Sequence, residues 1–217
     1  MAQGGRNLTF YGSVQGAETV VLTLHGRGSS ARGILGLADV LGDGLGAGSV
    51  AFAAPEAEGN SWYPHSFLVP LERNEPYLSA ALQAVEDALG ELEADVPRER
   101  TVLLGFSQGA CLALEFAARN AGRYGGVVAF SGGLIGPEGT PRNYPGSLSG
   151  TPVFLGCSDV DAHIPEARVR ESAEVMRKLG GVVDLRIYPG MGHTVNEDEI
   201  TAAKAVIAGA GRGARRG

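Results

Sequence analysis

Residues 101–112 read Thr-Val-Leu-Leu-Gly-Phe-Ser-Gln-Gly-Ala-Cys-Leu, and their pattern decides the fold class. The first four residues form an apolar run, which is typical of a strand buried on both faces of a parallel sheet. Residues 105–109 then match the pattern Gly-x-Ser-x-Gly, and apolar side chains at helical spacing follow from Cys111. This motif places a serine on a strained turn between a strand and a helix, with its hydroxyl clear of the sheet. The stretch therefore predicts Ser107 as a catalytic nucleophile.

Similar apolar runs recur along the chain and alternate with helical patterns. The strand-like runs are 8–11, 20–24, 50–53, 101–104, 126–130, 152–155 and 183–188. The helical patterns are 78–89, 111–116, 169–179 and 200–208, and a stretch rich in Gly, Pro and Ser over 137–152 is typical of a surface loop. We therefore expect an α/β protein with the α/β-hydrolase fold, in which a mostly parallel sheet of about seven strands has helices on both faces. A single domain over residues 1–217 fits this length.

Composition narrows the classes of partner. The chain has 217 residues, of which 44% are hydrophobic, and a formal net charge of −6. Such an acidic chain offers no basic face for phosphates, so no nucleic acid is expected as a partner. No run approaches the roughly 18 apolar residues of a membrane helix, and the N-terminus lacks the apolar stretch of a signal peptide. We therefore expect a cytoplasmic protein without stable membrane insertion, and a homodimer is compatible with the sequence.

A serine nucleophile needs a base, and the base needs an acid that orients it. In this fold the chain order is serine, acid, histidine, so only His163 and His193 of the four histidines are eligible. His193 lies between the last expected strand and the last expected helix, at the edge where open α/β sheets bind ligands. His193 is therefore the expected base, and a solvated loop histidine is the alternative. Asp159 and Asp161 both follow the run at 152–155, and geometry inferred from the sequence does not choose between them as the acid.

Acyl transfer also needs backbone N–H groups that bind the developing oxyanion. One expected donor is the amide of Gln108, directly after the nucleophile. The other is the amide of Arg27, in the loop after the run at 20–24, where glycines on either side let the backbone bend inward. An ordinary glycine turn is the alternative interpretation of this loop.

The stretch 55–76 is irregular and carries a cluster of aromatic residues. Such residues can line a binding pocket or fold back as a small core beneath the loop, and the sequence leaves both readings open. We expect Trp62 and Phe67, together with Met191 beside the candidate base, to form the substrate pocket.

No cofactor and no metal are expected. The glycine loop after the run at 20–24 lacks the Lys-Ser/Thr end of a phosphate-binding loop, and no Cys/His cluster has zinc spacing. Cys111 and Cys157 are too few for a disulfide framework, so we expect two reduced, buried thiols. Cys157 does not lie in a motif of the Gly-x-Ser-x-Gly kind, on a turn between a strand and a helix, which favours a packed thiol over a nucleophile.

Several motifs together resemble those of the phospholipase/carboxylesterase family of α/β-hydrolases, which are relatives of the acyl-protein thioesterases. The matching segments are Leu-His-Gly-Arg-Gly at 24–28, Asn-Ser-Trp-Tyr-Pro at 60–64, Gly-Phe-Ser-Gln-Gly-Ala at 105–110, Asp-Ala-His-Ile-Pro at 161–165 and Gly-Met-Gly-His at 190–193. The segment at 60–64 is similar to a bacterial branch of small carboxylesterases. Family members carry an Asp-Pro-x-Val-Pro block whose Asp falls on Asp161, so the resemblance implies Asp161 as the acid. Ala162 in place of the usual proline, and Cys157-Ser158 in place of His-Gly, depart from the family outside the three catalytic positions.

The motifs and the resemblance imply a serine carboxylesterase that forms an acyl-enzyme with a small-molecule ester. Ser107 would attack, His193 would transfer the proton and Asp161 would orient the imidazole. Short to medium acyl groups are expected, because the stretch 55–76 would cover an extended groove. An acyl-protein thioesterase or lysophospholipase is the alternative within the same class. A catalytically inactive hydrolase fold that only binds small molecules is the alternative from another class, although the sequence lacks none of the three catalytic residues.

Overall fold

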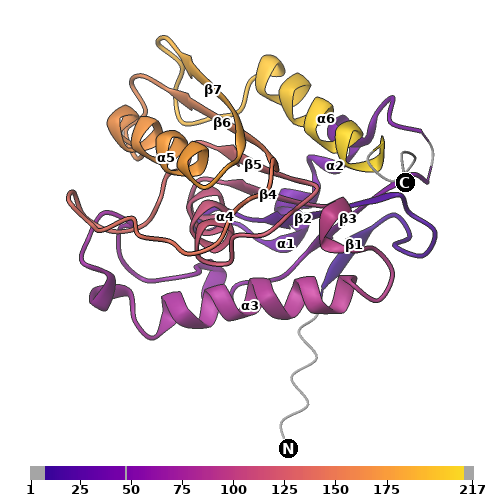
Figure 1. Ribbon diagram of the computed structural model, residues 1–217, viewed down its shortest axis with the longest axis horizontal. Coiled ribbons are helices and arrows are strands. Elements are labelled where there is room, and N and C mark those ends of the chain that lie inside the picture. The colour runs from indigo at the N-terminus through magenta and orange to yellow at the C-terminus, as the bar shows by residue number, and fades with distance from the viewer. Residues whose placement is uncertain (1–7, 47, 213–217) are drawn as a thin grey trace, which may run out of the picture.

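A computed structural model describes residues 8–46 and 48–212 of the protein. The chain forms a seven-stranded sheet with helices on both sides (Figure 1). The strands are β1 (Thr9–Tyr11), β2 (Thr19–Leu24), β3 (Val50–Ala54), β4 (Thr101–Phe106), β5 (Gly126–Phe130), β6 (Pro152–Ser158) and β7 (Val182–Tyr188). Their spatial order is β1-β3-β2-β4-β5-β6-β7, in which β1 pairs antiparallel with β3 and the other pairs are parallel. The predicted α/β-hydrolase fold is confirmed, and all seven expected strands are present.

The central strands are apolar along their length because helices cover both of their faces. Every residue of β2 and of β5 is buried, as the continuous apolar runs predict. The edge strand β7 is half-buried and contains charged side chains. The register between β2 and β4 pairs Leu24 with Gly105, so the loop that begins at His25 lies beside the turn that carries Ser107.

Six α-helices of the described residues form the two outer layers. They are α1 (Ala31–Leu35), α2 (Ala38–Gly42), α3 (Tyr77–Leu92), α4 (Gln108–Arg119), α5 (Glu166–Lys178) and α6 (Glu197–Arg212). The first core cluster joins α3, α4 and α5 to one face of the sheet, and the second joins α1, α2 and α6 to the opposite face. The four longer helices match the predicted patterns. The short helices α1 and α2 were not predicted, because five residues are too few to show a helical period.

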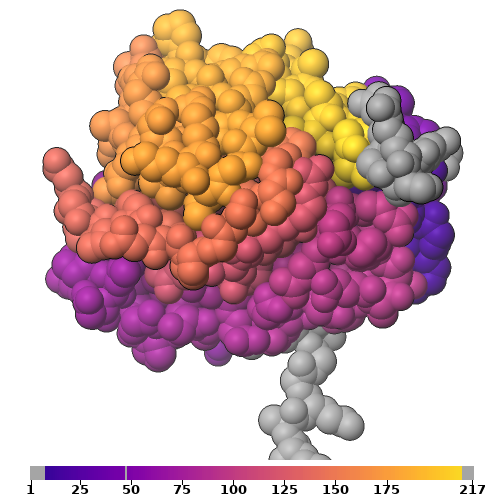
Figure 2. Space-filling model, in the orientation of Figure 1, coloured from indigo at the N-terminus to yellow at the C-terminus, as the bar shows by residue number. Residues whose placement is uncertain are grey.

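Two long irregular segments border the sheet. Residues 137–151 contain no helix and run as a salmon-coloured band across one face, as Figure 2 shows, which confirms the predicted surface loop. The segment between β3 and α3 contains two short 3₁₀ helices, Glu58–Asn60 and Leu71–Asn74. Within the described part of the chain, none of the helices combines the length and the apolar character needed to cross a bilayer.

Candidate active site

The turn between β4 and α4 holds Ser107 in a strained conformation. Ser107 has φ +56° and ψ −118°, a region that residues other than glycine rarely adopt. Its backbone N–H donates to the Phe130 carbonyl at 2.9 Å, which ties the turn to β5. A Cβ on Gly105 would lie 2.3 Å from the Gly109 carbonyl, and a Cβ on Gly109 would lie 2.0 Å from the Leu24 oxygen. The two glycines of the motif are therefore needed for the close approach of strand, turn and helix.

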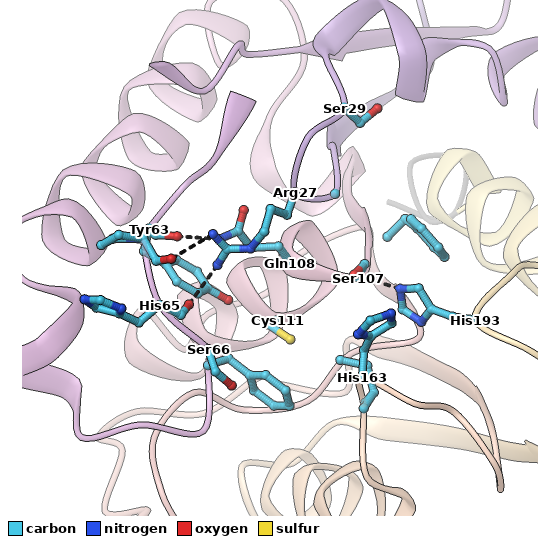
Figure 3. Close-up of a pocket in the computed structure, with 15 residues that line it drawn as sticks. Arg27, Ser29, Tyr63, His65, Ser66, Ser107, Gln108, Cys111, His163 and His193 are labelled. Carbon is cyan, nitrogen blue, oxygen red and sulfur yellow. Dashed lines mark hydrogen bonds between the residues drawn. The ribbon is translucent and has the colours of Figure 1, made fainter. Parts of the chain in front are cut away.

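Three side chains from three separate loops form a continuous chain of hydrogen bonds. His193 Nε2 lies 2.9 Å from Ser107 Oγ (Figure 3), and His193 Nδ1 lies 2.7 Å from Asp161 Oδ2. Because a carboxylate can only accept, Nδ1 carries the proton and Nε2 is left to accept from the serine hydroxyl. The three residues follow β4, β6 and β7, so the parallel strands bring them to one edge of the sheet.

Burial and hydrogen bonding act in opposite directions on Asp161. Burial acts to raise the pKa of its carboxyl, but hydrogen bonds from His193 and from two backbone amides outweigh this, and the pKa lies below its usual value. The amides are those of His163 and Ile164, at 2.8 and 3.0 Å from Oδ1. Asp161 therefore stays charged at neutral pH, where it can hold the imidazole in one orientation. Asp159 instead accepts a backbone N–H from the loop that precedes His193, at 2.8 Å.

Two backbone N–H groups are available beside the serine. Arg27 and Gln108 both line the cavity next to Ser107. Neither backbone amide has an acceptor among the hydrogen bonds found within residues 8–46 and 48–212, whereas the amide of Ser107 is already bonded. Unpaired amides at a nucleophile can bind an oxygen that acquires negative charge.

The cavity at this edge of the sheet has a volume of about 670 Å³ (Figure 3). It is lined by the loop after β2, by segment 63–67, by the start of α4 and by the loops that carry His163 and His193. Of the three residues predicted to form the pocket, Phe67 lines this cavity, while Trp62 and Met191 are not among its lining residues.

Trp62 packs into the interior instead of facing Ser107. Its side chain is 5% exposed, and its indole N–H donates to the His25 carbonyl at 2.8 Å. The indole also lies against the His25 ring, with the ring centroids 5.0 Å apart. The prediction that Trp62 walls the pocket is thus corrected, because a buried carbonyl satisfies the indole N–H on the core side of the loop. Met191 is likewise turned toward α6, where its Sδ accepts from Asn196 Nδ2 at 3.0 Å.

The side chain of Gln108 pins segment 61–65 to the start of α4. Its Oε1 accepts from the Trp62 N–H at 3.0 Å, and its Nε2 donates to the Tyr63 carbonyl at 2.8 Å. The side chain is nearly buried, so these bonds replace solvation that the amide has lost. Sequence reasoning assigned only the backbone of this residue to the site, since a partner almost fifty residues away leaves no local pattern.

The side chain of Arg27 holds the same segment from the loop after β2. Its guanidinium donates to the carbonyls of Pro64 and His65, at 3.0 and 2.7 Å, and to Ser61 Oγ at 2.9 Å. The loop after β2 and segment 61–65 are therefore coupled through one side chain. The sequence indicated the backbone of Arg27, but nothing in it indicated this second role.

Both cysteines are free thiols. Cys111 lines the cavity one helical turn after the serine, and burial raises its pKa to about 12. Burial also raises the pKa of Cys157 to about 12, and its Sγ lies 3.8 Å from the Asp161 carboxylate. Both thiols are therefore neutral at physiological pH, which argues against Cys157 as a nucleophile. Among the described residues, no three His, Cys, Asp or Glu side chains are grouped so that they could hold a metal ion.

Comparison with known proteins finds similar proteins that are named as esterases and thioesterases. A phospholipase/carboxylesterase from Dyadobacter fermentans DSM 18053 is 42% identical, with a TM-score of 0.87 over 95% of this chain and 98% of that one. Esterase PE8 is 28% identical, with a TM-score of 0.73 over 91% of this chain and 95% of that one. Acyl-protein thioesterase 1 of Debaryomyces hansenii is 33% identical over 114 residues, which are 52% of this chain and 49% of that protein.

The thioesterase relatives differ in how much of their length they share with this chain. In several of them, as in the Debaryomyces protein, the matched part spans about half of the relative's length. The match to acyl-protein thioesterase 1 of Eremothecium gossypii is longer, with 26% identity over 89% of this chain and 88% of that protein. The sequence profile described as Phospholipase/Carboxylesterase matches residues 12–209. The protein belongs to the phospholipase/carboxylesterase family of α/β-hydrolases.

Proposed function

We propose that the protein is a serine hydrolase that cleaves carboxylic esters through an acyl-enzyme on Ser107. The observation that carries the proposal is the unbroken hydrogen-bond chain from Ser107 through His193 to Asp161, with distances of 2.9 and 2.7 Å. A serine hydroxyl becomes an effective nucleophile when a base within hydrogen-bond reach is itself oriented by a third group.

In the first half of the reaction, Ser107 Oγ attacks the acyl carbon while His193 Nε2 takes the hydroxyl proton. The carboxylate of Asp161 stabilises the imidazolium that forms. The amides of Arg27 and Gln108 bind the oxyanion of the tetrahedral intermediate. The intermediate then collapses, the bond to the alcohol breaks and the imidazolium returns its proton to the departing oxygen, which leaves the acyl group on Ser107.

In the second half, water enters the position that the alcohol has left. His193 removes a proton from the water, which attacks the acyl carbon, and the same amides bind the second oxyanion. Collapse breaks the bond to Ser107 Oγ, which recovers its proton from His193. The products are one carboxylic acid and one alcohol, and no cofactor takes part.

A thioesterase acting on acylated proteins is supported by a different observation, the names of the relatives. The chemistry on Ser107 would be the same, with a thiol as the leaving group. A buried Phe67 in the cavity wall favours short to medium acyl groups over long chains. A binding module without activity is disfavoured, because the strained turn at Ser107 and the paired His193 have no evident role in binding alone.

Active-site labelling tests the proposal. A fluorophosphonate should add its mass to the peptide that contains Ser107, and Ser107→Ala should abolish both the labelling and the hydrolysis of 4-nitrophenyl acetate. A parallel assay with an S-acyl peptide compares thioester with ester cleavage. Active protein without label on Ser107, or full activity of Ser107→Ala, would overturn the assignment.

A further inference from the structure

The cavity beside Ser107 has an unusual charge composition for this chain. The whole sequence contains 24 acidic and 18 basic residues, yet none of the fifteen residues that line the cavity is Asp or Glu. The lining includes the guanidinium of Arg27 and the imidazoles of His65, His163 and His193. The cavity lining thus carries one permanent positive charge, on Arg27, and no carboxylate.

Arg27 has no carboxylate partner among the residues that the structure describes. Its three hydrogen bonds go to the neutral oxygens of Ser61, Pro64 and His65, and no ion pair of Arg27 occurs among the described residues. A guanidinium has five N–H donors. These bonds use both hydrogens of Nη1 and one of Nη2, so the Nε–H and the second Nη2–H remain for a ligand.

The carboxylates around this region are engaged elsewhere. Asp161 is fully buried behind His193 and bonds to its imidazole. Glu56, on the far side of the loop after β2, accepts the backbone N–H of Ala31 and lies 3.3 Å from His25 Nε2. The charge of Arg27 is therefore not neutralised by either carboxylate.

Figure 3 shows where this charge lies relative to the nucleophile. The guanidinium extends from the loop beside Ser107 toward Tyr63 and His65, away from His193. The Tyr63 ring lies under it, with 5.9 Å between the guanidinium carbon and the ring centroid. A negative group on one end of a substrate can thus reach Arg27 while the scissile carbonyl lies at Ser107.

We propose that the preferred substrates are esters that carry a carboxylate, and that Arg27 binds this carboxylate at the wall formed by segment 63–65. This inference rests on the proposed ester hydrolysis and names its substrate class. Arginine suits the role, because its planar N–H groups match the geometry of a carboxylate and remain charged at all physiological pH values. His65 offers a further imidazole at the same wall.

Matched pairs of esters test the proposal. The first pair is 4-nitrophenyl hexanoate and mono-4-nitrophenyl adipate, which have equal acyl length and differ in the terminal carboxylate. The second pair is methyl 4-acetoxybenzoate and 4-acetoxybenzoate, which place the charge in the leaving group. In at least one pair, Arg27→Gln should reduce the ratio of kcat/KM for the anionic over the neutral ester by roughly ten- to a hundredfold, the usual effect of a lost charge-assisted hydrogen bond. Arg27→Lys, which keeps the charge but loses the planar pair of N–H donors, should retain part of that ratio.

The ratio separates substrate binding from damage to the loop. Loss of the bonds to segment 61–65 would slow both members of a pair equally, so it would leave the ratio unchanged. The matched control is Arg177→Gln, which removes an exposed charge from α5 and should not alter the ratio. Higher salt should reduce the wild-type ratio. If the neutral esters are cleaved through Ser107 but Arg27→Gln changes neither ratio, the inference is overturned and the hydrolase function stands. If the wild-type protein cleaves no member of either pair, both the substrate-class inference and the proposed hydrolase function fail.

Discussion

Asp159 and Asp161 are two aspartates that closely follow the end of β6, but their carboxylates bind different groups. Asp161 Oδ2 bonds to the imidazole of His193, whereas Asp159 Oδ1 bonds to the backbone N–H of Gly190. The first interaction fixes which imidazole nitrogen carries the proton. The second fixes only the start of the loop that carries His193. The two residues therefore allow a comparison in which charge and distance from β6 are nearly constant.

Asp161→Asn should reduce kcat by about 10⁴, because an amide can donate to Nδ1 and so favour the tautomer in which Nε2 no longer accepts from Ser107. Asp159→Asn keeps an acceptor for Gly190 and should reduce kcat by less than about tenfold, as expected for one exposed hydrogen bond. Both values come from initial rates on 4-nitrophenyl acetate, with circular dichroism to verify folding. A larger loss for Asp159→Asn than for Asp161→Asn would reverse the assignment of the acid.

Segment 61–65 behaves as one structural unit although it has no regular secondary structure. Gln108 holds its backbone from α4, Arg27 holds it from the loop after β2, and the Trp62 indole anchors it in the core. Both faces of the segment therefore have a role. The side of Tyr63 and His65 lines the cavity, and the side of Trp62 faces the interior.

Trp62→Ala should lower the free energy of unfolding by about 3–5 kcal/mol, because it removes a large buried side chain. It should leave the relative kcat/KM values for 4-nitrophenyl esters of increasing acyl length unchanged. Phe67→Ala is the matched control, since Phe67 is equally buried but lines the cavity. It should also destabilise the protein, and in addition it should raise the relative rate of the longer esters. A changed acyl-length profile in Trp62→Ala, with stability intact, would contradict this division.

Sequence periodicity predicted the elements whose burial is uniform and missed the features that depend on distant contacts. β2 and β5 are buried throughout, so an apolar run was sufficient to identify them. The Gly-x-Ser-x-Gly motif identified Ser107, and the chain order typical of this fold then placed the acid and the histidine after it. Which side of the loop Trp62 faces depends on the His25 carbonyl, which no local pattern reveals. The side-chain role of Gln108 escaped prediction for the same reason.

Across the whole molecule, the loop that carries His193 is fixed at both of its ends. Asp159 holds its start, and a reciprocal pair of bonds holds its end, where α6 begins. In that pair Asn196 Oδ1 accepts the Glu199 N–H and Glu199 Oε2 accepts the Asn196 N–H, both at 2.9 Å. Glu199 is fully buried over β6, and its Oε1 has no hydrogen-bond partner in the described structure. Glu199 therefore both caps the start of α6 and carries a buried carboxyl group.

This arrangement makes the stability of the molecule depend on pH. Burial raises the pKa of Glu199 to about 7 from an ordinary value of 4.5, against the opposing effect of its bond from Asn196. The native state therefore binds the proton more tightly than the unfolded chain does. The stabilisation is complete below about pH 4.5 and is lost as the pH rises through 7, with a total of about 3 kcal/mol.

Glu199→Gln should remove this dependence, because an amide does not titrate. Urea denaturation between pH 5 and pH 8 should show wild-type stability falling relative to that of Glu199→Gln by about 2 kcal/mol, whatever the absolute difference between the two proteins at pH 5. Asp198→Asn is the control from the same turn. The pKa of Asp198 is lowered by hydrogen bonds from Arg186 and Tyr188, so its own contribution is lost only in acid. Its charge is the smallest of the effects on the pKa of Glu199, so its variant should keep most of the wild-type slope above pH 5. Parallel stability curves for wild type and Glu199→Gln would mean that Glu199 keeps one protonation state throughout this range, and the pH dependence would then have to come from other groups.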